Sequence, residues 1–101
     1  MELKELEARM HEFVAGKGWY DAGSPKVQSP NNLAMSLAIE AAEVLEHFQW
    51  GDETADSDAL ASELADVALY LLQLASISGI DLEQAILDKL ALNQDREWSV
   101  S

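Results

Sequence analysis

Two pairs of acidic residues interrupt apolar stretches of the chain, Glu40-x-x-Glu43 and Glu63-x-x-Asp66. Residues three apart lie on the same face of an α-helix, so each pair directs both of its carboxylates to one side. No Lys or Arg occurs between Val27 and Asp88, so this segment has no basic side chain to neutralise them. Four acids held close together repel one another unless a cation lies between them. The pattern therefore restricts the fold to helices that share a cation.

Carboxylate oxygens are the ligands that Mg²⁺ and Mn²⁺ prefer, and Mg²⁺ usually keeps coordination sites for water and phosphate. The pattern thus predicts a Mg²⁺ site, with Mn²⁺ as an alternative ion, that acts on a phosphorylated substrate. The competing interpretation is that each acidic stripe is the solvated face of its helix. Solvated faces usually mix acids with Lys and Arg, whereas these stripes contain no base, and helix bundles are known hosts for carboxylate clusters.

Composition excludes several classes of function. The 101 residues form one domain, residues 1–101, and the formal net charge of −13 repels nucleic-acid backbone and anionic lipid. We therefore expect no nucleic-acid partner. No uninterrupted apolar run approaches the length of a membrane span, and the polar first ten residues do not resemble a signal peptide. The absence of cysteine fits a cytoplasmic protein, which is the location we expect.

The apolar periodicity predicts four helices and no strands, over about residues 2–15, 30–50, 57–78 and 82–96. Ser29 followed by Pro30 is a helix-start signal, and Asp81 is the expected N-cap of the last helix. The second and third helices are apolar over most of their circumference, so each must bury more than one side. We expect an all-α four-helix bundle that is completed by homo-oligomerisation, as a homodimer or homotetramer.

Three segments resemble the MazG-like all-α nucleotide pyrophosphohydrolases, in particular their single-domain, dCTP pyrophosphatase-like members. These segments are Asn32–Trp50, Glu63–Tyr70 and Ile80–Arg96. The signature of that family is E-x-x-E, a gap of variable length and E-x-x-D. The Phe-Gln-Trp sequence at residues 48–50 and the Lys-x-x-x-Asn-x-x-Arg pattern at residues 89–96 make the resemblance more specific, and it covers nearly the whole chain.

The resemblance implies hydrolysis of a (deoxy)nucleoside triphosphate between its α- and β-phosphates, which gives a monophosphate and pyrophosphate and serves nucleotide-pool housekeeping. It makes Glu40, Glu43, Glu63 and Asp66 the Mg²⁺ ligands and catalytic residues. A bound Mg²⁺ neutralises phosphate charge and lowers the pKa of a bound water that becomes the nucleophile. One of the four carboxylates can instead accept a proton from that water.

The same resemblance implies seven substrate-binding residues: Trp19, Asn32, Trp50, Tyr70, Lys89, Asn93 and Arg96. The aromatic residues would surround the base, and the three on the last helix would hold phosphate oxygens. Each has a simpler alternative, such as core packing for the two Trp residues or a cation near a helix C-terminus for Arg96. Some relatives have a histidine that would align with Met10. His11 lies one residue away, about 100° round the helix, and is assigned no role.

Two other functions are alternatives to triphosphate hydrolysis. One is a related diphosphohydrolase that acts on dUTP or phosphoribosyl-ATP. The other is an acidic helical interaction module that recruits a basic partner. The lack of basic residues in both acidic stripes, together with candidate phosphate ligands near the C-terminus, argues against the interaction module.

Overall fold

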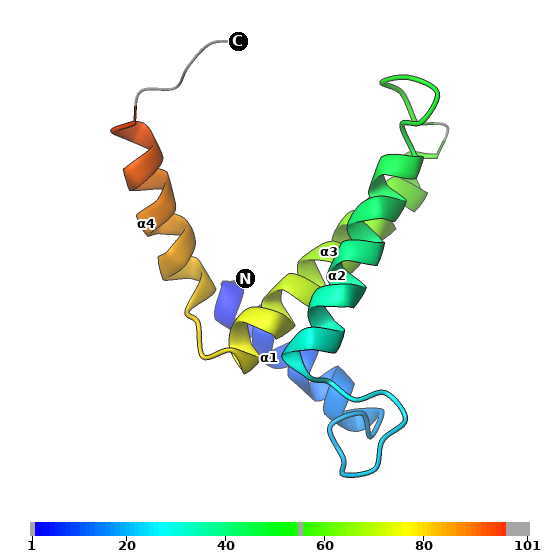
Figure 1. The fold of residues 1–101 in the computed structure, drawn as a ribbon, viewed down its shortest axis with the longest axis vertical. Helices are drawn as coiled ribbons and strands as arrows, with labels where there is room; N and C mark the ends of the chain where they lie inside the picture. The colour runs from blue at the N-terminus through cyan, green and yellow to red at the C-terminus, as the bar shows by residue number, and fades with distance from the viewer. Residues whose placement is uncertain (1, 55, 97–101) are drawn as a thin grey trace.

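The fold consists of four helices, α1 Leu3–Gly16, α2 Pro30–Glu46, α3 Ser57–Ile77 and α4 Leu82–Gln94 (Figure 1). The structure is a computed structural model that describes residues 2–54 and 56–96. Within these ranges no strand forms, so the all-α prediction is confirmed. The predicted helix bounds agree to within two residues except at the end of α2.

Side-chain caps fix three of the helix starts. The Ser29 hydroxyl accepts a hydrogen bond from the N–H of Asn32, which satisfies one of the unpaired donors in the first turn of α2. The Asp81 carboxylate accepts from the N–H of Gln84 at the start of α4. Asp56 caps α3 in the same way, accepting from two backbone N–H groups. The predicted starts of α2 and α4 are therefore confirmed, with Pro30 as the first residue of α2.

The end of α2 differs from the prediction, because the helix stops at Glu46 rather than near Trp50. The N–H groups of residues 47–49 donate to carbonyls three residues earlier, as in the tightened turns that often follow an α-helix. Gly51 then adopts a φ of 146°, which closes the turn in a conformation that favours glycine. Trp50 consequently lies on a turn outside the helix.

The buried core lies where α1 crosses the C-terminal half of α3. Met10, Val14 and Leu72 are buried together, and the partly buried Leu3, Trp19 and Leu82 pack against them. Away from this core, α2 and α3 run antiparallel beside each other (Figure 1). The antiparallel pair therefore brings the C-terminal half of α2 against the N-terminal half of α3, where the acidic pairs lie.

Helix α4 diverges from the α2–α3 pair, and its first residue Leu82 packs against the core near the end of α3 (Figure 1). Its residues 83–92 are all exposed. The radius of gyration is 16.3 Å, compared with about 13 Å for a compact domain of this length. Large exposed apolar residues occur on all four helices, and those on α2, α3 and α4 include Met35, Ile39, Leu45, Leu64, Leu69, Leu71, Ile86, Leu87, Leu90 and Leu92. A single copy of the chain therefore leaves the bundle open.

One expectation about membranes is corrected by α3. This helix has 21 residues and a mean hydropathy of 1.4 over its most apolar window, so by length and composition alone it is able to cross a bilayer. The sequence predicts no apolar run of this length, whereas this helix reaches it although Glu63 and Asp66 lie within it. A single helix of this kind is weak evidence for a membrane protein.

Candidate active site

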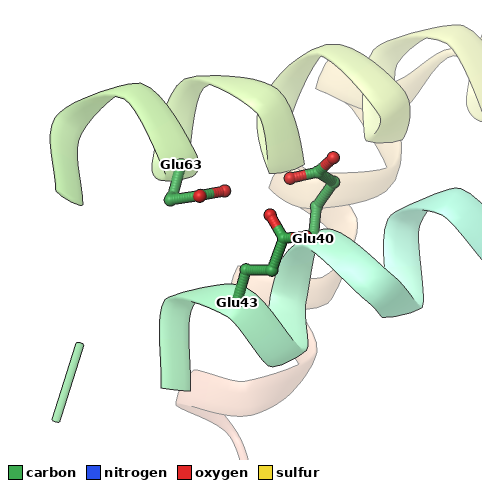
Figure 2. A group of neighbouring side chains, drawn as sticks. All are labelled: Glu40, Glu43 and Glu63. Atoms are coloured by element: carbon green, nitrogen blue, oxygen red, sulfur yellow. The ribbon is translucent and has the colours of Figure 1, made fainter. Parts of the chain in front are cut away.

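Three of the four predicted carboxylates come together between two helices. Glu40 and Glu43 on α2 and Glu63 on α3 each place one carboxylate oxygen within 4.8 Å of the others (Figure 2). All three side chains are half-buried. They extend into the space between the antiparallel helices rather than toward bulk water (Figure 2). The helix pairing thus converts two distant sequence motifs into one cluster, which we call the carboxylate cluster.

The electrostatics of the carboxylate cluster are unfavourable without a cation. Oε2 of Glu40 and Oε2 of Glu63 are buried, and no described residue donates a hydrogen bond to either oxygen. The pKa of Glu40 is raised from 4.5 to about 7, first by burial and then by the hydrogen bonds that its protonated form makes with Glu63 and Glu43. The charges of Glu43 and Asp66 act in the same direction. Each of these causes disfavours ionised Glu40, as expected for acids that share a site without a counter-charge.

Asp66 lies one turn beyond Glu63 on α3 and connects the carboxylate cluster to a neighbouring pocket. Its charge contributes to the raised pKa of Glu40, so it is electrostatically part of the site. Its carboxylate is not among the three that lie within 4.8 Å of one another. Instead, Asp66 lines the adjacent pocket. The fourth predicted ligand is therefore at the border of the cluster.

The pocket has a volume of about 380 Å³ and lies between α1, the loop that follows it and α3. A volume of this size is typical of small-molecule sites. Two of the predicted base-binding residues, Trp19 and Tyr70, line it. The Trp19 ring is held from two sides, since Phe13 contacts it edge-on at 5.6 Å and the Lys26 ammonium lies 4.5 Å from its centroid. The pocket thus offers a fixed aromatic surface close to the carboxylates.

A chain of amide groups borders the same pocket, and its role was not predicted from the sequence. Gln73 is only 3% exposed, and its Nε2 donates to Gln28 Oε1 at 2.7 Å and to the Tyr20 hydroxyl at 3.3 Å. The Nε2 of Gln28 donates in turn to the carbonyl of Lys26 at 2.7 Å. Both Gln73 and Gln28 line the pocket. The one available signal was that Gln73 lies on the same helical stripe as Tyr70.

His11 also has a role that the sequence did not predict. Its Nδ1 lies 2.5 Å from the Tyr20 hydroxyl and its Nε2 lies 2.7 Å from the Ser76 hydroxyl, so it joins α1 to the loop and to α3. Burial raises the pKa of Tyr20, while its hydrogen bond with Gln73 lowers it, so the phenol stays protonated at neutral pH. His11 is therefore part of the polar support beneath the pocket.

The remaining predicted substrate residues lie away from the carboxylate cluster within one copy of the chain. Trp50 is 93% exposed on the turn after α2. The side chain of Asn32 donates a hydrogen bond to the carbonyl of Val27, as an ordinary polar residue in the first turn of a helix can do. Lys89 and Asn93 belong to the C-terminal half of α4 and Arg96 follows its end, on the helix that diverges from the α2–α3 pair (Figure 1). One copy therefore brings together three of the four predicted metal ligands and two of the predicted base-binding residues, but not the predicted phosphate ligands.

Comparison with known proteins shows the family. A profile of the MazG-like family matches residues 35–100, a region that contains both acidic pairs and the whole carboxylate cluster. The chain belongs to the MazG-like family. The resemblance to this family that the sequence predicts is thereby confirmed.

Two curated proteins and one solved structure are similar to this MazG-like chain. Mouse dCTP pyrophosphatase 1 is 35% identical over 103 aligned residues, which cover 93% of this chain and 58% of the mouse protein. This chain thus spans less than two thirds of that relative. A dATP/dGTP diphosphohydrolase of Salmonella phage PMBT28 is 47% identical over 38 residues, 38% of this chain and 13% of the phage protein. The crystal structure of a pyrophosphatase from Archaeoglobus fulgidus superimposes with a TM-score of 0.73 at 34% identity, over 91% of this chain and 88% of that one.

Proposed function

We propose that this MazG-like protein is a Mg²⁺-dependent enzyme that hydrolyses (deoxy)nucleoside triphosphates to a monophosphate and pyrophosphate, as part of nucleotide-pool housekeeping. The observation that carries the proposal is the carboxylate cluster, three acids from two helices within 4.8 Å, beside a pocket lined by aromatic side chains. The names of the relatives, a dCTP pyrophosphatase, a dATP/dGTP diphosphohydrolase and a pyrophosphatase, support the same chemistry.

The residues of the cluster fit a divalent cation. Two buried carboxylate oxygens, one on Glu40 and one on Glu63, lack a hydrogen-bond donor among the described residues, and buried polar atoms normally have a partner. The donor set is all oxygen, which suits Mg²⁺ or Mn²⁺. Glu40, Glu43 and Glu63 would hold the ion, with Asp66 at its border. When bound, the ion would supply charge neutralisation for the phosphates and a lowered pKa for a coordinated water.

The arrangement along α3 suggests how a nucleotide would lie. Glu63, Asp66, Tyr70 and Gln73 follow one another along the same face of α3. Ten residues of helix span about 15 Å, which is comparable to the length of an extended nucleoside triphosphate. A base stacked on Trp19 and Tyr70 would therefore direct its phosphates past Asp66 to the carboxylate cluster.

A second copy of the chain would complete this site. Lys89, Asn93 and Arg96 lie far from the carboxylate cluster, on a helix whose residues 83–92 are all exposed. Association through the exposed apolar faces of α2, α3 and α4 would cover those faces, and it would allow α4 of one copy to approach the cluster of another. We therefore propose a homodimer or homotetramer, measurable by light scattering coupled to size-exclusion chromatography. A monomer at micromolar concentration would contradict this part of the proposal.

Pyrophosphate release from a panel of ribo- and deoxynucleoside triphosphates, with Mg²⁺ and with EDTA, tests the activity. We expect release only with Mg²⁺ or Mn²⁺, and its loss in Glu40→Gln and Asp66→Asn with the fold retained by circular dichroism. Matched controls are Glu46→Gln on α2 and Asp58→Asn on α3, both exposed positions outside the cluster. Full activity in Glu40→Gln would refute the ligand assignment, and no release from any nucleotide would favour the acidic interaction module.

A further inference from the structure

We propose that Gln73 selects nucleobases that carry an exocyclic amine, such as cytosine and adenine, over their keto counterparts. This inference rests on the proposed function, since it concerns the base of the nucleotide that the enzyme hydrolyses. Gln73 lines the pocket beside Tyr70 and is 3% exposed, so its amide has little freedom to rotate or to exchange with water. The proposal depends on which end of that amide faces the ligand.

Two hydrogen bonds fix the orientation of the amide. A backbone carbonyl only accepts hydrogen bonds, so the contact between Gln28 and the Lys26 carbonyl identifies the Gln28 atom as Nε2. The opposite atom of Gln28 is then Oε1, an acceptor, and it contacts Gln73 at 2.7 Å. The Gln73 atom at that contact must therefore be its donor, Nε2. The amide orientation thus follows from a backbone group through two side chains.

The carbonyl oxygen of Gln73 is left available by this arrangement. Its Nε2 is engaged by Gln28 and Tyr20, and no described residue donates to its Oε1. Tyr20 contacts the Nε2 end of the Gln73 amide and accepts a hydrogen bond there, rather than approaching Oε1. The Oε1 is also absent from the buried atoms that lack a partner, so it keeps access to solvent. Gln73 lines the pocket, so a residue of its wall carries an acceptor that no described residue engages.

An acceptor of fixed direction discriminates between amine and keto groups at the same ring position. The 4-amino group of cytosine or the 6-amino group of adenine would donate to Gln73 Oε1. The keto oxygen of uracil or hypoxanthine would instead face Gln73 Oε1, which is also an acceptor. The bound base would shield both oxygens from water without supplying a donor, which costs free energy. Sites built to hydrogen-bond a substrate group reject analogues that lack it more strongly than apolar pockets do.

The test compares two nucleotide pairs that differ in one group, dCTP with dUTP and dATP with dITP, by kcat/KM for pyrophosphate release. We expect the wild-type protein to prefer the amine of each pair by about tenfold or more, the loss of a hydrogen bond in a buried site. Gln73→Met keeps the length of the side chain without its polar atoms, and we expect it to bring both ratios to within about threefold of one. The change should lie in KM, because the contact is present in ground and transition state alike.

Two further variants separate selection from structural support. In Gln28→Met the amide of Gln73 loses its orienting partner and can rotate, so we expect the dCTP/dUTP and dATP/dITP ratios of kcat/KM both to fall toward one. Gln84→Met, an exposed position on α4, is the matched control and should keep the wild-type ratios. A wild-type enzyme without amine preference, or a Gln73→Met variant that keeps it, would overturn the inference while leaving the proposed function intact.

The two proposals also fail differently. If no triphosphate is hydrolysed, the proposed function fails, and calorimetric titration with dCMP and dUMP then tests the base preference without catalysis. Equal dissociation constants for the two monophosphates would overturn the role of Gln73. A preference for dCMP that Gln73→Met removes would support it.

Discussion

Replacing Glu40 by Gln should stabilise the metal-free protein at neutral and alkaline pH, although it removes a proposed metal ligand. Burial and the neighbouring acids together raise the pKa of Glu40 from 4.5 to about 7. Between these two pH values the folded state keeps a proton that the unfolded state has released. The free energy of unfolding therefore falls as pH rises from about 4.5 to about 7 and is constant above that range. Gln is neutral at every pH, so the variant lacks this contribution.

The magnitude follows from the size of the pKa change. A rise from 4.5 to about 7 corresponds to at most about 3.4 kcal/mol at about 1.4 kcal/mol per pH unit. Because the carboxylate cluster is only half-buried, solvent screening reduces this to about 1 kcal/mol. For a chain of about 100 residues, 1 kcal/mol shifts the melting temperature by about 4 °C or slightly more.

The assay is thermal unfolding followed by circular dichroism in EDTA, from pH 5 to pH 8, for wild type, Glu40→Gln and the control Glu46→Gln. The melting temperature of Glu40→Gln minus that of wild type should increase with pH and level off above pH 7. Glu46→Gln should show no such pH-dependent gain. A Glu40→Gln variant that is less stable than wild type at pH 8, or a difference that does not change with pH, would refute the electrostatic account of the cluster.

Three other outcomes are expected. Mg²⁺ at 100 times its dissociation constant should raise the free energy of unfolding of the wild type by about 2.7 kcal/mol in denaturant titrations, and should not stabilise Glu40→Gln; equal stabilisation of both would place the ion elsewhere. Leu72→Ala removes a buried core side chain and should lower the free energy of unfolding by about 2–5 kcal/mol, whereas a loss below 1 kcal/mol would contradict the described core. Trp19→Ala should raise KM for the preferred nucleotide by about tenfold, within the range for loss of one stacked base, with little change in kcat, and an unchanged KM would show that the base lies elsewhere.

The sequence predicted the helices and the acidic cluster because both depend on local spacing. Residues three apart share a helix face whatever the helix packs against, and the starts at Ser29 and Asp81 are set by the capping side chain itself. Antiparallel pairing of neighbouring helices then placed Glu63 opposite Glu40 and Glu43. These features required no knowledge of distant contacts.

The rest depends on contacts between distant parts of the chain. The hydrogen bond between Gln28 and Gln73 joins residues 45 positions apart, across a loop whose path no periodicity describes. His11 was discounted because it is one residue from the position expected in relatives, yet its position suits Tyr20 and Ser76. The divergence of α4 from the α2–α3 pair was also not predicted. An apolar helix face indicates that the face is covered, but it does not identify the segment that covers it.

The most direct test of the central claim is a crystal structure with Mn²⁺ and a non-hydrolysable deoxynucleoside triphosphate, with diffraction recorded at the manganese absorption edge. The account predicts an anomalous peak within coordinating distance of Glu40, Glu43 and Glu63, with phosphate oxygens on its open side. Manganese bound elsewhere, with these three carboxylates left without an ion while the nucleotide is bound, would contradict it.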